Sequence, residues 1–205
     1  LRNAPQGRPH VGFVHCDCGQ FLFDGGRVTG VIDFELAYLG DSAGADLAGI
    51  RSRQLSEPLG DMRAIVRRYE EIAGAPVDRR AIDYHTVRFG LTNPLGLAPV
   101  LAKPVPAMND AQYLAWYVVY SRCPLEVMAH KLGVELEAPS VPEPEPTYSH
   151  TATTFLVEAL DELLRGKQGE ERYEIDRLHR VAQYLERSDR HRAALDADDL
   201  AEAAE

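Results

Sequence analysis

Residues 11–48 read VGFVHCDCGQFLFDGGRVTGVIDFELAYLGDSAGADLA, and this stretch decides the fold. Apolar runs near 11–15, 20–24 and 27–33 predict three β-strands. Asp24-Gly25-Gly26 separates the last two and predicts a hairpin, because Asp and Gly tolerate the positive φ angles of tight turns. Asp17 follows the first strand and Asp33 ends the hairpin. Two carboxylates placed together by a hairpin suit magnesium and phosphate chemistry.

Four short motifs follow one another along this stretch: His15-x-Asp17, Ile32-Asp33-Phe34-Glu35, Gly40-Asp41 and Asp46-Leu47-Ala48. In this order they resemble the catalytic segment of the aminoglycoside phosphotransferase and choline kinase family, which has a protein-kinase-like fold. The motifs cover about a fifth of the chain. The resemblance implies an ATP-dependent phosphotransferase that uses magnesium and acts on a hydroxyl group of a small molecule.

The resemblance also implies roles for individual residues. Asp17 would be the catalytic base that receives the proton of the substrate hydroxyl, and Asp33 would bind magnesium on the nucleotide phosphates. His15 would brace the catalytic loop, and Asp46 would open a buried helix and accept hydrogen bonds from the loop backbone. The family has an Asn five residues after its catalytic Asp as a second metal ligand, whereas this chain has Gln20 three residues after Asp17.

For three of these positions, two interpretations of the role of the side chain stay open. Gln20 is a metal ligand or a polar loop residue, because an amide oxygen binds magnesium only when it is well aimed. Glu35 lies at the edge of the site or on the surface. Asp41 touches substrate or caps the helix that follows it. The interval from Asp41 to Asp46 is one residue longer than is usual in the family.

The composition narrows the class of protein. The 205 residues carry a net charge of -10, which argues against a nucleic-acid partner because phosphates attract Lys and Arg. The charge is compatible with a cationic substrate, although solubility is the simpler explanation. Three cysteines form no disulfide framework and predict a reducing, cytoplasmic location. No apolar run reaches the roughly 18 residues of a membrane span.

The remainder of the chain is predicted to be helical. Periodicity, caps and proline breaks predict helices over about 42–53, 61–73, 78–92 and 110–123, a restart from Pro124 to Leu132, and two helices after the proline-rich linker. Asn93-Pro94 is expected to interrupt the third helix, because proline lacks an N–H group. The helix over 110–123 is apolar nearly all round and is predicted to be buried or to form the wall of a pocket. The fold class is therefore α+β, mainly α-helical.

We predict three regions. Residues 1–136 form a kinase-like C-terminal lobe, with the catalytic segment at 11–48 and a helical remainder at 49–136. Residues 137–147 form a Pro/Glu-rich linker, and residues 148–205 a helical extension. Residues 1–10 read as a polar lead-in without a glycine-rich loop or lysine, so we expect an N-terminal nucleotide lobe to be absent and the chain to be part of a longer protein.

Two other functions compete with the phosphotransferase. One is a non-catalytic pseudokinase or interaction scaffold, which the short loop and the Gln at position 20 favour. The other is a metal-binding module, suggested by His15-Cys16-Asp17-Cys18 but lacking a second ligand pair in the sequence. The C-terminal helices can dock on the lobe or on another copy of the chain, which would make a homo-oligomer.

Overall fold

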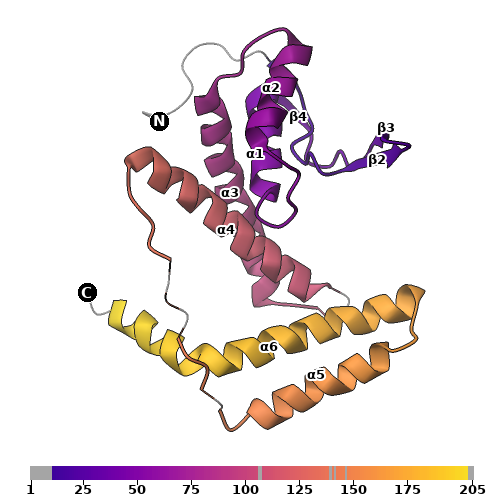
Figure 1. Ribbon diagram of the computed structural model, residues 1–205, viewed down its shortest axis with the longest axis vertical. Helices are drawn as coiled ribbons and strands as arrows, with labels where there is room; N and C mark the ends of the chain where they lie inside the picture. The colour runs from indigo at the N-terminus through magenta and orange to yellow at the C-terminus, as the bar shows by residue number, and fades with distance from the viewer. Residues whose placement is uncertain (1–10, 106–107, 139, 141, 146, 203–205) are drawn as a thin grey trace. The chain divides into compact units, whose positions relative to one another are not determined.

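The structure is a computed structural model, which describes residues 11–105, 108–138, 140, 142–145 and 147–202. The predicted lead-in at 1–10, Pro106 and the linker prolines Pro139 and Pro146 lie outside the described residues. The helices are α1 (Ser42–Arg53), α2 (Met62–Ala73), α3 (Arg79–Ala102), α4 (Asp110–Leu132), α5 (His150–Leu164) and α6 (Gly169–Glu202). The chain is mainly helical with small antiparallel strands, as predicted (Figure 1).

The strands form two separate pairs. β2 (Phe21–Asp24) and β3 (Arg27–Val31) make the predicted hairpin, and Gly25 and Gly26 have φ angles of 53° and 75° in its turn. β1 (Val11–Val14) pairs instead with β4 (Tyr38–Asp41), a strand that the sequence analysis missed. This pairing returns the chain to the start of α1, directly beside the loop that follows β1.

The chain divides into two compact units. The first contains the described residues up to Val100 together with Trp116–Leu136, and the second contains Leu101–Ala115 with Glu137–Glu205. In the first unit, α1, α2 and α3 bury a core of Leu47, Ala48, Val66 and Ile82. A second cluster of Val14, Cys16 and Ala45 fixes β1 and its following loop to α1. In the second unit, α5 and α6 lie side by side (Figure 1).

Helix termini follow the predicted signals at most positions. Asp41 caps α1, since its Oδ1 accepts a hydrogen bond from the Gly44 N–H at 3.2 Å. Gly74 ends α2 with a φ of 67°, a left-handed conformation that glycine adopts without a Cβ clash. At the start of α4, Asn109 Oδ1 accepts a hydrogen bond from the Gln112 N–H at 3.2 Å.

The predicted break at Asn93-Pro94 is wrong, because α3 continues through both Pro94 and Pro99. The side chains of Thr92 and Asn93 donate to carbonyls of the preceding turn, and Asn93 Nδ2 lies 2.9 Å from the Phe89 oxygen. These bonds support the turn before Pro94, whereas the carbonyl that loses its i+4 donor to the proline is that of Gly90.

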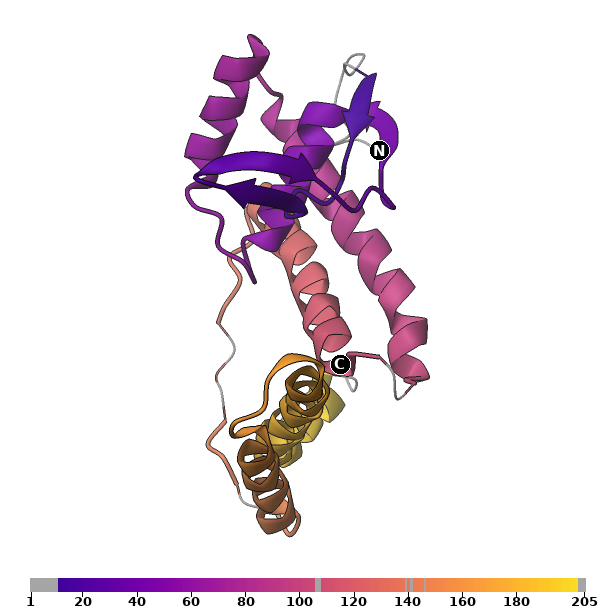
Figure 2. The same ribbon diagram turned by 90° about the vertical axis from the view of Figure 1, so that its right-hand side faces the viewer.

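The predicted restart at Pro124 is also wrong, because α4 is continuous through it. α3 and α4 cross in Figure 1 and diverge toward one end in Figure 2, and Pro124 packs directly onto Gly90. A Cβ at position 90 would lie 2.5 Å from the Pro124 ring, so this close approach requires glycine. Burial of α4 all round is not found, since Val118 and Leu125 are more than half exposed.

None of the described helices combines the length and the apolar character that a membrane crossing requires.

Candidate active site

The loop after β1 is held by Asp46 from the second turn of α1. Asp46 Oδ1 accepts hydrogen bonds from the backbone N–H groups of His15 at 3.0 Å and Cys16 at 2.9 Å. The Cys18 thiol donates to the Asp46 carbonyl at 2.8 Å. Burial raises the pKa of the Asp46 carboxyl, and the two N–H donors offset part of that rise. One carboxylate therefore fixes the backbone on which Asp17 is mounted.

His15 connects the first motif to the second. Its Nε2 lies 2.8 Å from the Ile32 carbonyl oxygen, which can only accept, so this nitrogen carries the proton. The imidazole is buried and packs edge-on against Phe34, with ring centroids 4.9 Å apart. The imidazole therefore braces two loops. Its Nε2 is bonded to the Ile32 carbonyl and is not free to contact a substrate.

The backbone also joins the two motifs. The Ile32 N–H donates to the Gln20 carbonyl at 3.0 Å, and the Gln20 N–H donates to the Asp17 carbonyl at 3.2 Å. Gln20 Nε2 lies 3.4 Å from Asp17 Oδ2, so the amide nitrogen faces the carboxylate. The hairpin thus places the residue before Asp33 against the loop that carries Asp17.

Asp33 and Glu35 form a pair of acids beside this loop. Contact with Asp33 raises the pKa of the Glu35 carboxyl, first through a hydrogen bond between the side chains and then through charge repulsion. A smaller part of the rise comes from the charge of Asp17. The carboxyl groups of Asp17, Asp33 and Glu35 therefore share one electrostatic environment.

Backbone strain concentrates in the same two motifs. Among the described residues, Cys16 and Asp33 are the non-glycine residues with positive φ, at 71° and 64°. A non-glycine residue in the left-handed region costs on the order of 1 kcal/mol or more and persists where the surroundings enforce it. Such residues gather at functional sites, and here one precedes Asp17 and the other is Asp33 itself.

Asp41 lies in a different setting. Besides capping α1, its Oδ2 lies 3.3 Å from Nε2 of His85 on α3. Burial lowers the pKa of His85, and the charge of Arg88 lowers it further, while Asp41 partly opposes both. The contacts of Asp41 are those of a helix cap and a buried histidine partner.

Arg53 is the residue that the sequence analysis missed. It ends α1, and its Nε lies 2.7 Å from Asp17 Oδ1, to which its Nη2 is also paired. A signal for it exists in the helical spacing, because Asp46, Gly49 and Arg53 recur at intervals of three and four residues and share one face of α1. All three contact the loop, since a Cβ on Gly49 would lie 2.6 Å from the Cys16 oxygen.

The donor chemistry of this site suits a magnesium–nucleotide complex. Magnesium in such sites takes one or two carboxylates and completes its shell with phosphate oxygens and water. Asp33 and Glu35 supply two adjacent exposed carboxyl groups. Contact with Asp33 raises the pKa of Glu35 and so favours its protonated form. No set of three His, Cys, Asp or Glu side chains in the described part of the chain could hold a metal ion by itself. Those residues therefore provide no ligand set for the metal-binding module considered above.

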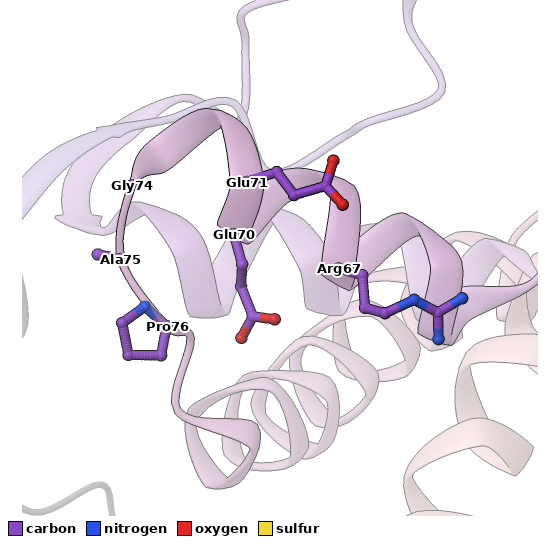
Figure 3. Close-up of a pocket in the computed structure, with 6 residues that line it drawn as sticks. All are labelled: Arg67, Glu70, Glu71, Gly74, Ala75 and Pro76. Carbon is purple, nitrogen blue, oxygen red and sulfur yellow. The ribbon is translucent and has the colours of Figure 1, made fainter.

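Two cavities of the first unit lie away from these carboxylates. One of about 450 Å³ is lined by Arg67, Glu70, Glu71, Gly74, Ala75 and Pro76 at the end of α2 (Figure 3). In the close-up, the side chains of Glu70 and Glu71 point to different sides of the helix. A second cavity, of about 490 Å³, lies between α1, α2 and α3 and contains Arg51 and Asp83. Neither is lined by Asp17, Asp33 or Glu35.

Comparison with known proteins agrees with the motifs. A family model described as the phosphotransferase enzyme family matches residues 1–89. That span includes β1 to β4, α1 and α2, and thus the whole catalytic segment. No curated protein and no solved structure matches the chain. The resemblance inferred from the motifs is confirmed, since residues 1–89 match the model of the phosphotransferase enzyme family.

Proposed function

We propose that the protein transfers the γ-phosphoryl group of ATP to a hydroxyl group of a small molecule. The observation that carries this proposal is the junction of the two motifs. Hydrogen bonds from Ile32 to Gln20 and from His15 to Ile32 hold the loop bearing Asp17 against the segment bearing Asp33 and Glu35. Phosphoryl transfer depends mainly on such positioning and on charge stabilisation.

In the proposed reaction, Asp17 accepts the proton of the acceptor hydroxyl. The hydroxyl oxygen forms a bond to the γ-phosphorus while the bond between that phosphorus and the β–γ bridging oxygen breaks. The products are a phosphate ester and ADP, and Asp17 then releases its proton to water. Asp33 and Glu35 would hold magnesium, which when bound neutralises charge on the phosphate oxygens. We further propose that residues 1–136 form a kinase-like lobe.

The test is phosphoryl transfer by the natural full-length protein. Radiolabelled ATP and magnesium are offered with an aminoglycoside, choline and a hexose, and labelled ester and ADP are measured. Asp17→Asn is expected to lower kcat by about 100-fold or more, since general-base catalysis contributes roughly 10²–10⁴-fold. Asp61→Asn, a matched change at the exposed cap of α2, is expected to keep the wild-type rate.

Equal rates for Asp17→Asn and the wild type would remove Asp17 from this role. A wild-type protein that binds magnesium–ATP but transfers nothing to any acceptor would instead be the non-catalytic scaffold. A cytoplasmic location, the lack of a nucleic-acid partner and self-association through α5 and α6 stay predictions.

A further inference from the structure

The guanidinium group of Arg53 lies directly against the proposed base. Both its Nε and its Nη2 engage Oδ1 of Asp17, and the two side chains are 14% and 20% exposed. We propose that Arg53 is a positioning residue, which occupies Oδ1 of Asp17 and leaves Oδ2 to receive the proton of the acceptor. This inference rests on the proposed phosphotransferase function and adds to it the choice of the reacting oxygen.

The two carboxylate oxygens of Asp17 have unequal surroundings. Oδ1 accepts two donors from one planar, permanently charged group, which restricts rotation of the carboxylate. Oδ2 has a long contact of 3.4 Å with the Gln20 amide nitrogen. A contact of that length is weak, so lone-pair capacity remains on Oδ2 for an incoming hydroxyl.

Arg53 is itself held from two further sides. Its Nη1 donates to Glu57 Oε2 at 2.9 Å, one helical turn along the chain. Its guanidinium passes over Gly19, where an added Cβ would lie 2.7 Å from Cζ. Burial alone would lower the pKa of Arg53, but hydrogen bonds and charge attraction from Asp17 and Glu57 outweigh it and raise the pKa. The group therefore stays charged where the loop places it.

A merely structural ion pair would make a different prediction from a positioning residue. Loss of a structural pair lowers stability and leaves the turnover of the remaining folded protein unchanged. Loss of a positioning group lowers kcat with little change in the KM for ATP, because the base is misplaced while the nucleotide contacts remain. A small guanidinium ion supplied from solution can then refill the vacated site.

The experiment uses the natural full-length protein, ATP, magnesium and the best of the acceptors tested above. Arg53→Ala is expected to lower kcat by roughly 10- to 100-fold, the scale of a small displacement of a reacting group. The KM for ATP is expected to stay within about twofold. Low concentrations of guanidinium chloride are expected to restore part of the kcat of Arg53→Ala and none of that of Asp17→Asn.

Arg51→Ala is the matched control, because Arg51 lies one half-turn earlier on α1 and pairs with Asp83 instead. It is expected to keep the wild-type kcat and to show no response to guanidinium. If Arg53→Ala does not fold, Arg53→Lys decides the question. Lysine keeps the charge but lacks the two-donor fork, so a several-fold loss of kcat is expected in a folded protein.

Several results would overturn the inference. One is a wild-type kcat in Arg53→Ala. Another is a raised kcat in Arg53→Ala, which would make the ion pair inhibitory. A third is a loss of kcat in Arg53→Ala that Arg51→Ala matches and that guanidinium does not reverse. An active wild type with an inactive Asp17→Asn and an unaffected Arg53→Ala would reject the role of Arg53 alone. A wild type without transfer to any acceptor would reject the proposed function itself.

Discussion

At the scale of single residues, Asp46 holds the loop on which Asp17 is mounted. Replacing it with alanine leaves the N–H groups of His15 and Cys16 without their acceptor. Asp46→Ala is expected to lower the free energy of unfolding by about 2 kcal/mol, the cost of unsatisfied partly buried donors. Asp46→Asn keeps an acceptor oxygen at the same place and is expected to cost less than about 1 kcal/mol. Urea unfolding measures both, and equal losses would show that the acceptor is not what matters.

His85 gives the first unit a dependence on pH. Its pKa in the folded protein lies below the ordinary 6.5, mainly because of burial. As pH falls below about 6.5, the unfolded chain binds a proton that the folded histidine still refuses, so stability decreases with decreasing pH. Stability above that range is unaffected by this group.

The corresponding prediction compares His85→Gln with the wild type. Glutamine does not titrate, so the variant is expected to lose less unfolding free energy between pH 7 and pH 5. Urea midpoints at the two pH values provide the measurement. The same loss in both proteins would assign the acid sensitivity to other groups.

At the scale of elements, the contact between α1 and the catalytic loop depends on Gly49. A Cβ there would lie 2.6 Å from the backbone oxygen of Cys16, which cannot rotate away. Gly49→Ala is expected to cost about 1–3 kcal/mol through overpacking and to lower kcat by displacing the loop.

The control for that change is Gly96→Ala on α3. An added Cβ at Gly96 meets nothing within 4 Å. Because alanine is the better helix former, this variant is expected to gain about 0.5–1 kcal/mol and to keep its kcat. Thermal unfolding and turnover are measured on both variants, and a neutral Gly49→Ala would mean that the loop can move without consequence.

Elements were predictable where the local signal was strong. The hairpin at Asp24-Gly25-Gly26 and the helix ended by Gly74 appear as expected, since a turn or cap there has few alternatives. The breaks predicted at Pro94 and Pro124 were wrong. At Pro124 the reason is not local, because Gly90 on α3 accommodates the proline ring of α4. At Pro94, the side chains of Thr92 and Asn93 support the preceding turn.

Motif order predicted the carboxylates of the candidate site, but it did not predict the arginine that pairs with Asp17. Asp17 and Arg53 are separated by 36 residues, and no local pattern joins them. The helical face shared by Asp46, Gly49 and Arg53 becomes visible only once Asp46 is placed against the loop. β4 was not predicted for a similar reason, because its four residues pair with β1, which is distant in the sequence.

At the scale of the whole molecule, the two units have separate buried groups. Leu164 and Ala182 are buried in the second unit, whereas Leu47, Val66 and Ile82 form the core of the first. We expect calorimetry of the full chain to resolve two unfolding transitions. Leu164→Ala is expected to lower one of them, by about 2 kcal/mol or more, and Asp46→Ala the other. A single transition that both substitutions shift would show one cooperative body.

The left-handed backbone at Asp33 has a consequence for engineering. Glycine adopts such a conformation without penalty, so Asp33→Gly should make the protein more heat-resistant while deleting the carboxylate proposed to hold the cation. Screens that select for thermal stability alone would therefore favour inactive variants at this position. A programme to stabilise this chain should keep Asp33 unchanged from the start.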